Sequence, residues 1–127
     1  MTRSRRQAEA RGRWAEWLAI VWLAAKGYQL LDHRARTAAG EIDLIARRGE
    51  YLVFVEVKAR PTVEAALQSI GPRQRGRITR AASIWRAPRS EFHGLHLRYD
   101  LFLVVPGRWP QHRRAAWVPD DGARDLL

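Results

Sequence analysis

The sequence of 127 residues contains no cysteine, and this absence excludes several kinds of protein site. Without thiols the chain has no disulfide framework, no thiolate zinc site, no iron–sulfur cluster and no cysteine nucleophile. Lysine is nearly as scarce, because only Lys26 and Lys58 stand against 21 arginines. Any chemistry of this chain must therefore depend largely on carboxylates, arginines, histidines and these two lysines.

The sequence also lacks a long hydrophobic run. Its longest uncharged apolar stretch is nine residues, 17–25, whereas a helix needs about 20 apolar residues to cross a bilayer. The first residues are basic, but Glu16 and the absence of a small-residue cleavage site after the apolar stretch do not fit a signal peptide. We therefore expect a soluble, cytoplasmic protein with no membrane partner.

Negative charge is scarce as well, since 13 acidic residues stand against 23 basic ones and give a net charge of +10. Between Glu64 and Glu91 there is no acid at all, yet this segment carries Arg73, Arg75, Arg77, Arg80, Arg86 and Arg89. A small domain with such a charge attracts polyanions, and nucleic acid is the leading candidate.

The pattern of hydrophobic residues predicts one α/β domain spanning residues 1–127, a length that suits a single core. We expect a helix over 14–25, strands over 28–32, 41–46, 51–58 and 97–105, and a helix from Pro72 to Pro88. The strands at 41–46 and 51–58 form a hairpin, with Gly49 in the turn. The sheet is expected to be mixed and flanked by helices.

The two ends of the chain are expected to lie outside the regular elements. Residues 1–12 are interpreted as a flexible basic arm, and residues 106–127 as an irregular tail. The first helix is predicted to bury Trp14, Leu18, Val21, Trp22 and Ala25, which recur at helical spacing. The tryptophans are accordingly interpreted as core packing rather than as platforms for stacked bases.

Three residues of the central hairpin point to chemistry. Because alternate side chains of a strand share a face, Glu56 and Lys58 point the same way. The hairpin brings Asp43 of the neighbouring strand close to Glu56. Two converging carboxylates are unfavourable unless a proton or cation compensates them, and oxygen ligands of this kind suit Mg²⁺.

Lys58 strengthens this interpretation because a chain that otherwise uses arginine places one of its two lysines beside the acidic pair. A lysine there can orient an attacking water and neutralise phosphoryl charge. The alternative is structural: Glu56 and Lys58 form an ordinary ion pair on one strand face, and Asp43 is an edge residue.

The helix from Pro72 carries the residues expected to touch nucleic acid. Arg73, Arg77 and Arg80 share one face and can contact successive backbone phosphates. Gln74 and Arg75 lie in the same basic segment and are included in this group. A solvated basic face is the alternative. Elsewhere, Asp100 lies inside a buried strand and is expected to pair with Arg98 or an N-terminal arginine, without a catalytic role.

An aspartate on one strand followed by Glu-x-Lys on the next resembles the PD-(D/E)XK nuclease superfamily. The segment GEIDLIARRGEYLVFVEVKAR is similar to the YraN family, small bacterial proteins related to archaeal Holliday-junction resolvases. The similarity continues through GPRQRGRITRAA and LRYDLFLV and spans about residues 13–118. The resemblance implies a restriction-endonuclease-like fold with an αβββαβ core.

The resemblance also implies roles for individual residues. Asp43 and Glu56 would bind the metal with the backbone carbonyl of Val57, and Lys58 would be the catalytic lysine. Glu16 matches the acidic residue that the family places on the first helix, as a further catalytic and metal-binding group. On the residues alone, Glu16 is the only charge between positions 14 and 25, and an exposed helix edge is its alternative.

Three positions match the family less simply. Glu41 is similar to the glutamate of the GEID motif and supports the metal ligands or has a purely structural role. Relatives often read Pro-Arg-Lys-Gln where this chain has Pro-Arg-Gln-Arg at 72–75, so Gln74 matches only after a one-residue shift. The proline that precedes the aspartate in the superfamily is replaced by Ile42.

The resemblance and the charge together predict a metal-dependent endonuclease that hydrolyses phosphodiester bonds in DNA, branched or otherwise structured, rather than in RNA. Mg²⁺ is the expected cofactor, with Mn²⁺ as a substitute, and symmetric cutting of two strands would favour a homodimer. One alternative is a non-catalytic nucleic-acid-binding protein that retains the fold. Another is a basic protein that docks on an acidic partner.

Overall fold

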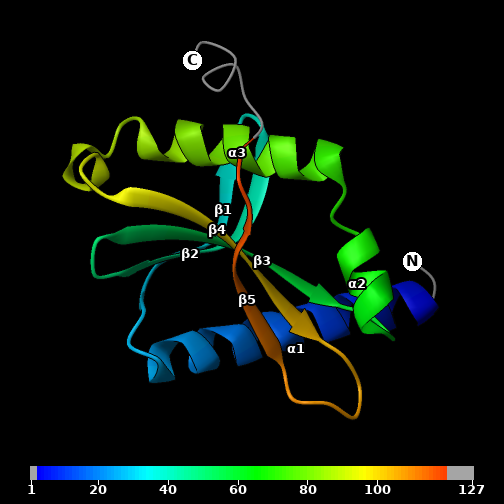
Figure 1. Cartoon of the computed structure of the whole chain (residues 1–127). Helices are drawn as coiled ribbons and strands as arrows, with labels where there is room; N and C mark the ends of the chain where they lie inside the picture. The colour runs from blue at the N-terminus through cyan, green and yellow to red at the C-terminus, as the bar shows by residue number, and fades with distance from the viewer. Residues whose placement is uncertain (1–2, 120–127) are drawn as a thin grey trace.

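The structure is a computed structural model that describes residues 3–119 (Figure 1). Its helices are α1 (Arg3–Ala25), α2 (Val63–Gln68) and α3 (Pro72–Arg86), with a 3-10 turn at Ser90–Phe92. Its strands are β1 (Gln29–Thr37), β2 (Gly40–Arg48), β3 (Tyr51–Ala59), β4 (His96–Val104) and β5 (Gln111–Trp117). None of the helices in this part of the chain is long and apolar enough to cross a membrane.

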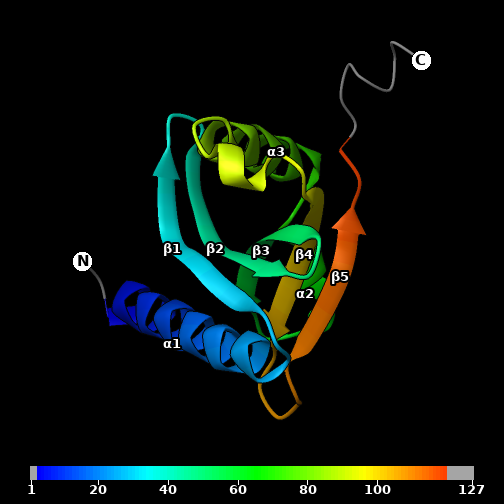
Figure 2. The same ribbon diagram turned by 90° about the vertical axis from the view of Figure 1, so that its left-hand side faces the viewer.

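The five strands form one mixed sheet in the order β1-β2-β3-β4-β5. Strands β3 and β4 run parallel, and the other neighbours are antiparallel. Helix α1 covers one face of the sheet and α3 covers the other, so the sheet lies between two helical layers (Figure 2). The predicted α/β fold with its αβββαβ core is confirmed.

Strand β3 is the centre of both cores, because its side chains alternate between the two helical layers. Leu52 and Phe54 pack under α3, whereas Val53, Val55 and Val57 pack under α1. Each such buried side chain contributes about 1.5–3 kcal/mol of hydrophobic stabilisation. The same alternation sends Glu56 and Lys58 toward the α3 side, as the sequence predicts.

Helix α1 begins at Arg3, so the prediction of a flexible arm over residues 1–12 is wrong for the described residues 3–12. The arm was inferred from its charge alone. Arginine, glutamine, alanine and glutamate are good helix formers, and they continue the helix that the apolar residues begin.

The predicted buried face of α1 is only partly right. The residues buried against the sheet are Ala15, Ala19 and Leu23, and the predicted Leu18 and Trp22 pack partly buried beside them. The expected core residues Trp14 and Val21 are instead 61% and 62% exposed. The small alanines let the helix approach the sheet closely, whereas indoles at those positions would hold it away. The helix is apolar on nearly all sides, so its periodicity does not define the buried face.

Two strands differ from the prediction. Strand β1 runs to Thr37, whereas the predicted strand ends at Asp32. The sequence does not reveal the second half of β1, because at the sheet edge its exposed face is polar and has no hydrophobic pattern. Strand β5, Gln111–Trp117, lies where an irregular tail was expected. It pairs with β4 and closes the sheet on that side. The rest of the predicted irregular tail, residues 120–127, lies outside the described residues.

A buried ionic network explains why β5 forms. Asp100 of β4 is fully buried and accepts hydrogen bonds from Arg98 at 2.8 and 2.9 Å, from His112 Nε2 at 2.7 Å and from the backbone N–H of Ala115 at 2.9 Å. Burial alone would raise the pKa of Asp100, but these hydrogen bonds outweigh it and lower the pKa. The predicted pairing with Arg98 is confirmed, and the network anchors β5 on β4.

Candidate metal and nucleic-acid site

Strand β2 leaves β3 at Asp43, and this departure creates the site. The last paired residues of the two strands are Leu44 and Val55. Beyond them the Asp43 carboxylate, rather than a backbone carbonyl, accepts the backbone N–H of Val57 at 2.8 Å. Ile42 packs under α3 while Leu44 packs under α1, so the usual alternation is broken at this point.

Glu56 is the buried partner of Asp43, with only 4% of the residue exposed. Its Oε2 accepts a hydrogen bond from Gln74 Nε2 at 3.0 Å. The same oxygen lies 3.7 Å from Lys58 Nζ and 3.9 Å from a terminal nitrogen of Arg77. A carboxylate so far from water is tolerated because two cations and an amide surround it.

The two carboxylates interact strongly. Burial, repulsion from Glu56 and a hydrogen bond with Glu56 raise the pKa of Asp43 to about 8, against the opposing effect of the Val57 N–H. In the metal-free protein Asp43 therefore retains a proton at neutral pH. A divalent cation would compensate the charge of this pair as the proton does.

The donor set fits Mg²⁺ rather than a metal that needs a complete protein cage. Within residues 3–119 no group of three or more His, Cys, Asp or Glu side chains is arranged to hold an ion. Mg²⁺ usually takes one or two carboxylates and completes its shell with waters and substrate phosphate. Asp43 and Glu56 meet that requirement. The backbone N–H of Val57 donates to Asp43. The role of the Val57 carbonyl as a metal ligand stays a prediction.

Glu16 of α1 lies beside the carboxylate pair and not within it. Its Oε1 accepts from His33 Nε2 and from Arg34 Nε, both at 2.8 Å. The side chain is 13% exposed, so the alternative of a solvent-exposed helix edge does not hold. Its charge still contributes to the raised pKa of Asp43. Glu16 therefore acts on the pair electrostatically in this arrangement, and direct metal binding stays a prediction.

The backbone explains how two consecutive residues of β1 reach Glu16. Neighbouring side chains of a strand normally point to opposite faces of the sheet. Arg34 has a φ of +54°, which interrupts that alternation. His33 and Arg34 can thus bind the same carboxylate. Neither residue could be predicted as a partner of Glu16, because a left-handed arginine inside a strand leaves no pattern in the sequence.

The residues predicted to touch nucleic acid divide into two groups. Gln74 and Arg77 point inward, where Arg77 Nε donates to Gln74 Oε1 at 3.1 Å and both side chains reach Glu56. Gln74 thus places its amide beside the carboxylates, and its match to the family's glutamine, which needs a one-residue shift, stays a prediction. Arg73, Arg75 and Arg80 are exposed on α3.

Residues 15–104 match the family described as Uncharacterised protein family UPF0102. The chain belongs to this family. A UPF0102 protein of Maricaulis maris is 86% identical over 127 residues, covering both chains completely. One of Methylocella silvestris is 50% identical over 118 residues, 93% of this chain and 95% of the relative. One of Mesorhizobium japonicum is 49% identical over 109 residues, 86% and 87% of the two chains.

Membership of the UPF0102 family confirms the predicted resemblance to YraN-like proteins. The matched segment runs from the second half of α1 to the end of β4 and so contains Glu16, Asp43, Glu56, Lys58 and Gln74. The names of these three relatives state the family and no activity. The site's chemistry must therefore be argued from its geometry.

Glu41 of this UPF0102 chain supports the site through its backbone. Its carbonyl accepts from an Arg77 terminal nitrogen at 3.1 Å, whereas its carboxylate is 43% exposed and lies 3.9 Å from Arg36. The Arg77 side chain is thus fixed between the start of β2 and Glu56. Whether the Glu41 carboxylate supports the metal ligands or is purely structural stays a prediction.

The close approach of Arg77 requires a glycine at position 40. Gly40 has a φ of +116°, and a Cβ there would collide with the Arg77 guanidinium. Gly40→Ala is expected to lower the free energy of unfolding by about 1–3 kcal/mol, because it combines backbone strain with that collision. Urea denaturation measures this change.

Gly12→Ala is the matched control for Gly40→Ala. Gly12 lies within α1, and a Cβ there meets no atom within 4 Å. This substitution is expected to raise the free energy of unfolding by about 0.5–1 kcal/mol, since alanine favours the helix. Equal effects of the two substitutions would contradict the role assigned to Gly40.

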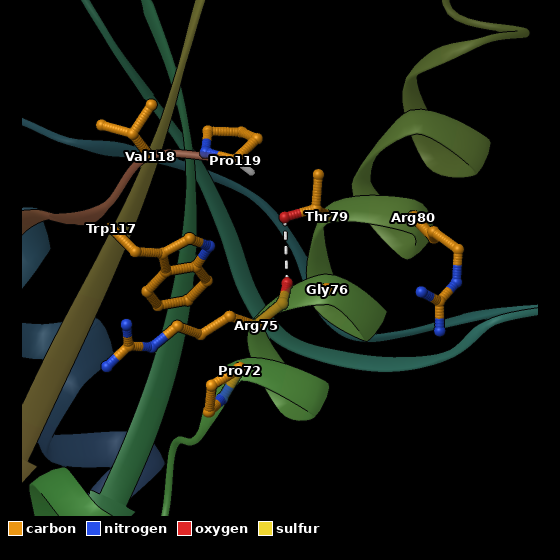
Figure 3. A pocket seen from close by; sticks show the side chains of 8 residues that line it. All are labelled: Pro72, Arg75, Gly76, Thr79, Arg80, Trp117, Val118 and Pro119. Carbon is orange, nitrogen blue, oxygen red and sulfur yellow. Dashed lines mark hydrogen bonds between the residues drawn. The ribbon is translucent and has the colours of Figure 1, made fainter. Parts of the chain in front are cut away.

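A pocket of about 540 Å³ lies elsewhere, between α3 and the end of β5 (Figure 3). Its lining includes Arg75, Thr79, Arg80 and Trp117. The Thr79 hydroxyl already has a partner, because its Oγ1 donates to the Arg75 carbonyl at 2.9 Å. Neither carboxylate of the site lines this pocket, so it is separate from the carboxylate site.

Proposed function

We propose that this protein is a metal-dependent nuclease that hydrolyses phosphodiester bonds in nucleic acid, with DNA preferred to RNA. The observation that carries the proposal is the pair of the half-buried Asp43 and the buried Glu56, with Lys58 Nζ 3.7 Å from Glu56. Partial burial and the neighbouring Glu56 raise the pKa of Asp43 at a cost to the stability of the fold, and groups with such shifts gather at functional sites. The net charge of +10 supports a polyanionic substrate.

In the proposed reaction the oxygen of a water molecule forms a new bond to phosphorus, and one ester P–O bond breaks. The products are a phosphate monoester and an alcohol, which takes up a proton. Asp43 and Glu56 would hold a Mg²⁺ ion, which would supply Lewis-acid stabilisation of the phosphate charge. Lys58 neutralises charge that develops on the phosphoryl oxygens and orients the water. Gln74 and Arg77 hold Glu56 in place.

The surface around the site supports backbone binding. Arg73, Arg75 and Arg80 are exposed on α3, the helix that brings Gln74 to the carboxylates. Contacts of arginine with phosphates give affinity without reading sequence. The proposal therefore predicts binding that weakens steeply with salt.

The experiment is cleavage of a labelled panel of branched, flapped, single-stranded and duplex DNAs, and of a matched RNA, with Mg²⁺, Mn²⁺ or EDTA. Cutting with either metal but not with EDTA supports the proposal. Binding without cutting of every substrate would contradict it and favour the second candidate.

The second candidate is a nucleic-acid-binding protein without catalysis. It is favoured by the neighbours of Glu56, because Lys58, Arg77 and Gln74 already compensate this carboxylate when no metal is bound. Such a protein would bind DNA in EDTA as tightly as in Mg²⁺. A divalent cation would then leave both its affinity and its thermal stability unchanged.

A further inference from the structure

Helix α1 presents an apolar face to solvent that no described element covers. Trp14, Trp17 and Val21 are between 61% and 63% exposed, and their spacing of three and seven residues places them on one side of the helix. Single exposed apolar residues are ordinary, but neighbouring ones on successive turns mark an interaction site. Two adjacent indoles also contradict the expectation that these tryptophans pack in the core.

The same side of the helix is basic. Arg6 and Arg13 are exposed and lie eleven and four residues before Trp17. At 3.6 residues per turn, these spacings place all three residues within about 40° of one another around the helix axis. Glu9 is the only acid between residues 3 and 15. A strip that combines exposed indoles with guanidinium groups suits a polyanion that also offers flat apolar rings.

This face adjoins the carboxylate site. The Trp17 ring lies 6.4 Å from the ring of His33, centroid to centroid. His33 in turn binds Glu16, and in the sheet it pairs with Leu44, the residue after Asp43. A strand that lies across Trp17 can therefore continue toward the carboxylates.

We propose that the face formed by Trp14, Trp17 and Val21, the α1 platform, stacks unpaired bases of the nucleic-acid substrate, while Arg6 and Arg13 bind its phosphates. The proposal rests on the proposed nuclease function and specifies its substrate as a nucleic acid with a single-stranded segment beside the cleavage site. Indoles bind bases of any sequence, because every base offers a π-face. Bases paired inside a duplex cannot reach such rings.

A second copy of this chain is a less suitable occupant. A two-fold interface brings the same surface from both copies together. Both copies would then add Arg6 and Arg13 to the interface, so the flanking charges brought together would have the same sign. A nucleic-acid strand brings phosphates to the same positions, so its charge is complementary.

The test measures binding without cleavage, by fluorescence anisotropy of a labelled 20-nucleotide single strand and a duplex of equal length in EDTA. Trp14→Ala and Trp17→Ala are each expected to weaken single-strand binding about five- to 100-fold, the usual effect of losing one stacked ring. Duplex binding should change less than about two-fold, because phosphate contacts dominate it.

Three further variants separate stacking from general loss of apolar surface. Trp109→Ala is the matched control: Trp109 is 82% exposed but lies in the loop between β4 and β5, so single-strand affinity should not change. Trp17→Phe keeps a π-face and should retain most of the affinity. Trp17→Leu keeps apolar surface without a ring and should behave like Trp17→Ala. Thermal unfolding checks that each variant is folded.

Equal weakening of single-strand and duplex binding, or no weakening, would overturn the α1 platform while leaving the nuclease proposal intact. Unchanged DNA binding together with a dimer-to-monomer change on Trp17→Ala, measured by sedimentation, would assign the face to a second copy. If the wild-type protein binds neither DNA, the nuclease proposal fails and the platform fails with it.

Discussion

Replacing Lys58 with methionine is expected to reduce phosphodiester cleavage about 10²–10⁴-fold without unfolding the protein. The Lys58 side chain is 16% exposed, and its ammonium lies 3.7 Å from Glu56 Oε2. Methionine keeps the apolar stem and removes the charge that would stabilise the transition state. Single-turnover cleavage of a labelled substrate in Mg²⁺ measures the change, and circular dichroism checks the fold.

Two variants control for this result. Lys26→Met removes the only other lysine, which is exposed at the end of α1 with its ammonium 5.5 Å from the Trp22 ring, and should leave cleavage unchanged. Lys58→Arg keeps the charge but spreads it over a planar group, and should not restore the full rate. A Lys58→Met protein that cleaves at the wild-type rate would exclude Lys58 from the reaction.

The second large effect concerns stability. The pKa of Asp43 is about 8 in the folded protein against 3.8 in the unfolded chain. At any pH between these two values, the folded protein holds a proton on Asp43 that the unfolded chain has lost. Folding stability from this group is therefore present below pH 4 and is lost as pH rises toward 8. Asp43→Asn cannot ionise and should be more stable than wild type at pH 8, by about 2–5 kcal/mol.

Thermal unfolding in EDTA between pH 4 and pH 8 measures this difference. The stabilities of wild type and Asp43→Asn should converge near pH 4 and separate as the pH rises. Glu41→Gln is the control, because Glu41 is an exposed carboxylate on the same strand. Parallel curves for wild type and Asp43→Asn would contradict the strained acidic pair.

Mg²⁺ should reverse the loss of stability in the wild-type protein. A cation replaces the proton shared by Asp43 and Glu56, so its stabilising effect should grow from pH 6 to pH 8. Asp43→Asn lacks one of the two carboxylates and should respond much less. An equal response of the two proteins would place the bound cation elsewhere.

Local pattern was sufficient to predict the centre of the fold. The alternation along β3 depends only on the period of a strand, so the common side of Glu56 and Lys58 could be predicted. Gly49 marks the tight turn of the hairpin, with a φ of +59°. The turn then places Asp43 near the end of β3. The proximity of Asp43, Glu56 and Lys58 can therefore be predicted from the pattern of two strands and from the turn at Gly49.

Features that depend on packing between distant elements could not be predicted in the same way. The burial of Ala15 and the exposure of Trp14 follow from how closely α1 approaches the sheet. Strand β5 exists because His112 and the Ala115 N–H reach Asp100, which lies on another strand. The position of Gln74 depends on where α3 begins and how it is rotated on the sheet.

The central claim is that Asp43 and Glu56 hold a divalent cation in a nuclease site, and calorimetric titration with Mn²⁺ at pH 7.5 tests it without knowledge of the substrate. The wild-type protein is expected to bind Mn²⁺ with release of protons, because the ion displaces the proton on Asp43. Asp43→Asn and Glu56→Gln should lose this binding, and Glu41→Gln should keep it. Absence of Mn²⁺ binding by the wild type, or unchanged binding by Asp43→Asn, would contradict the claim.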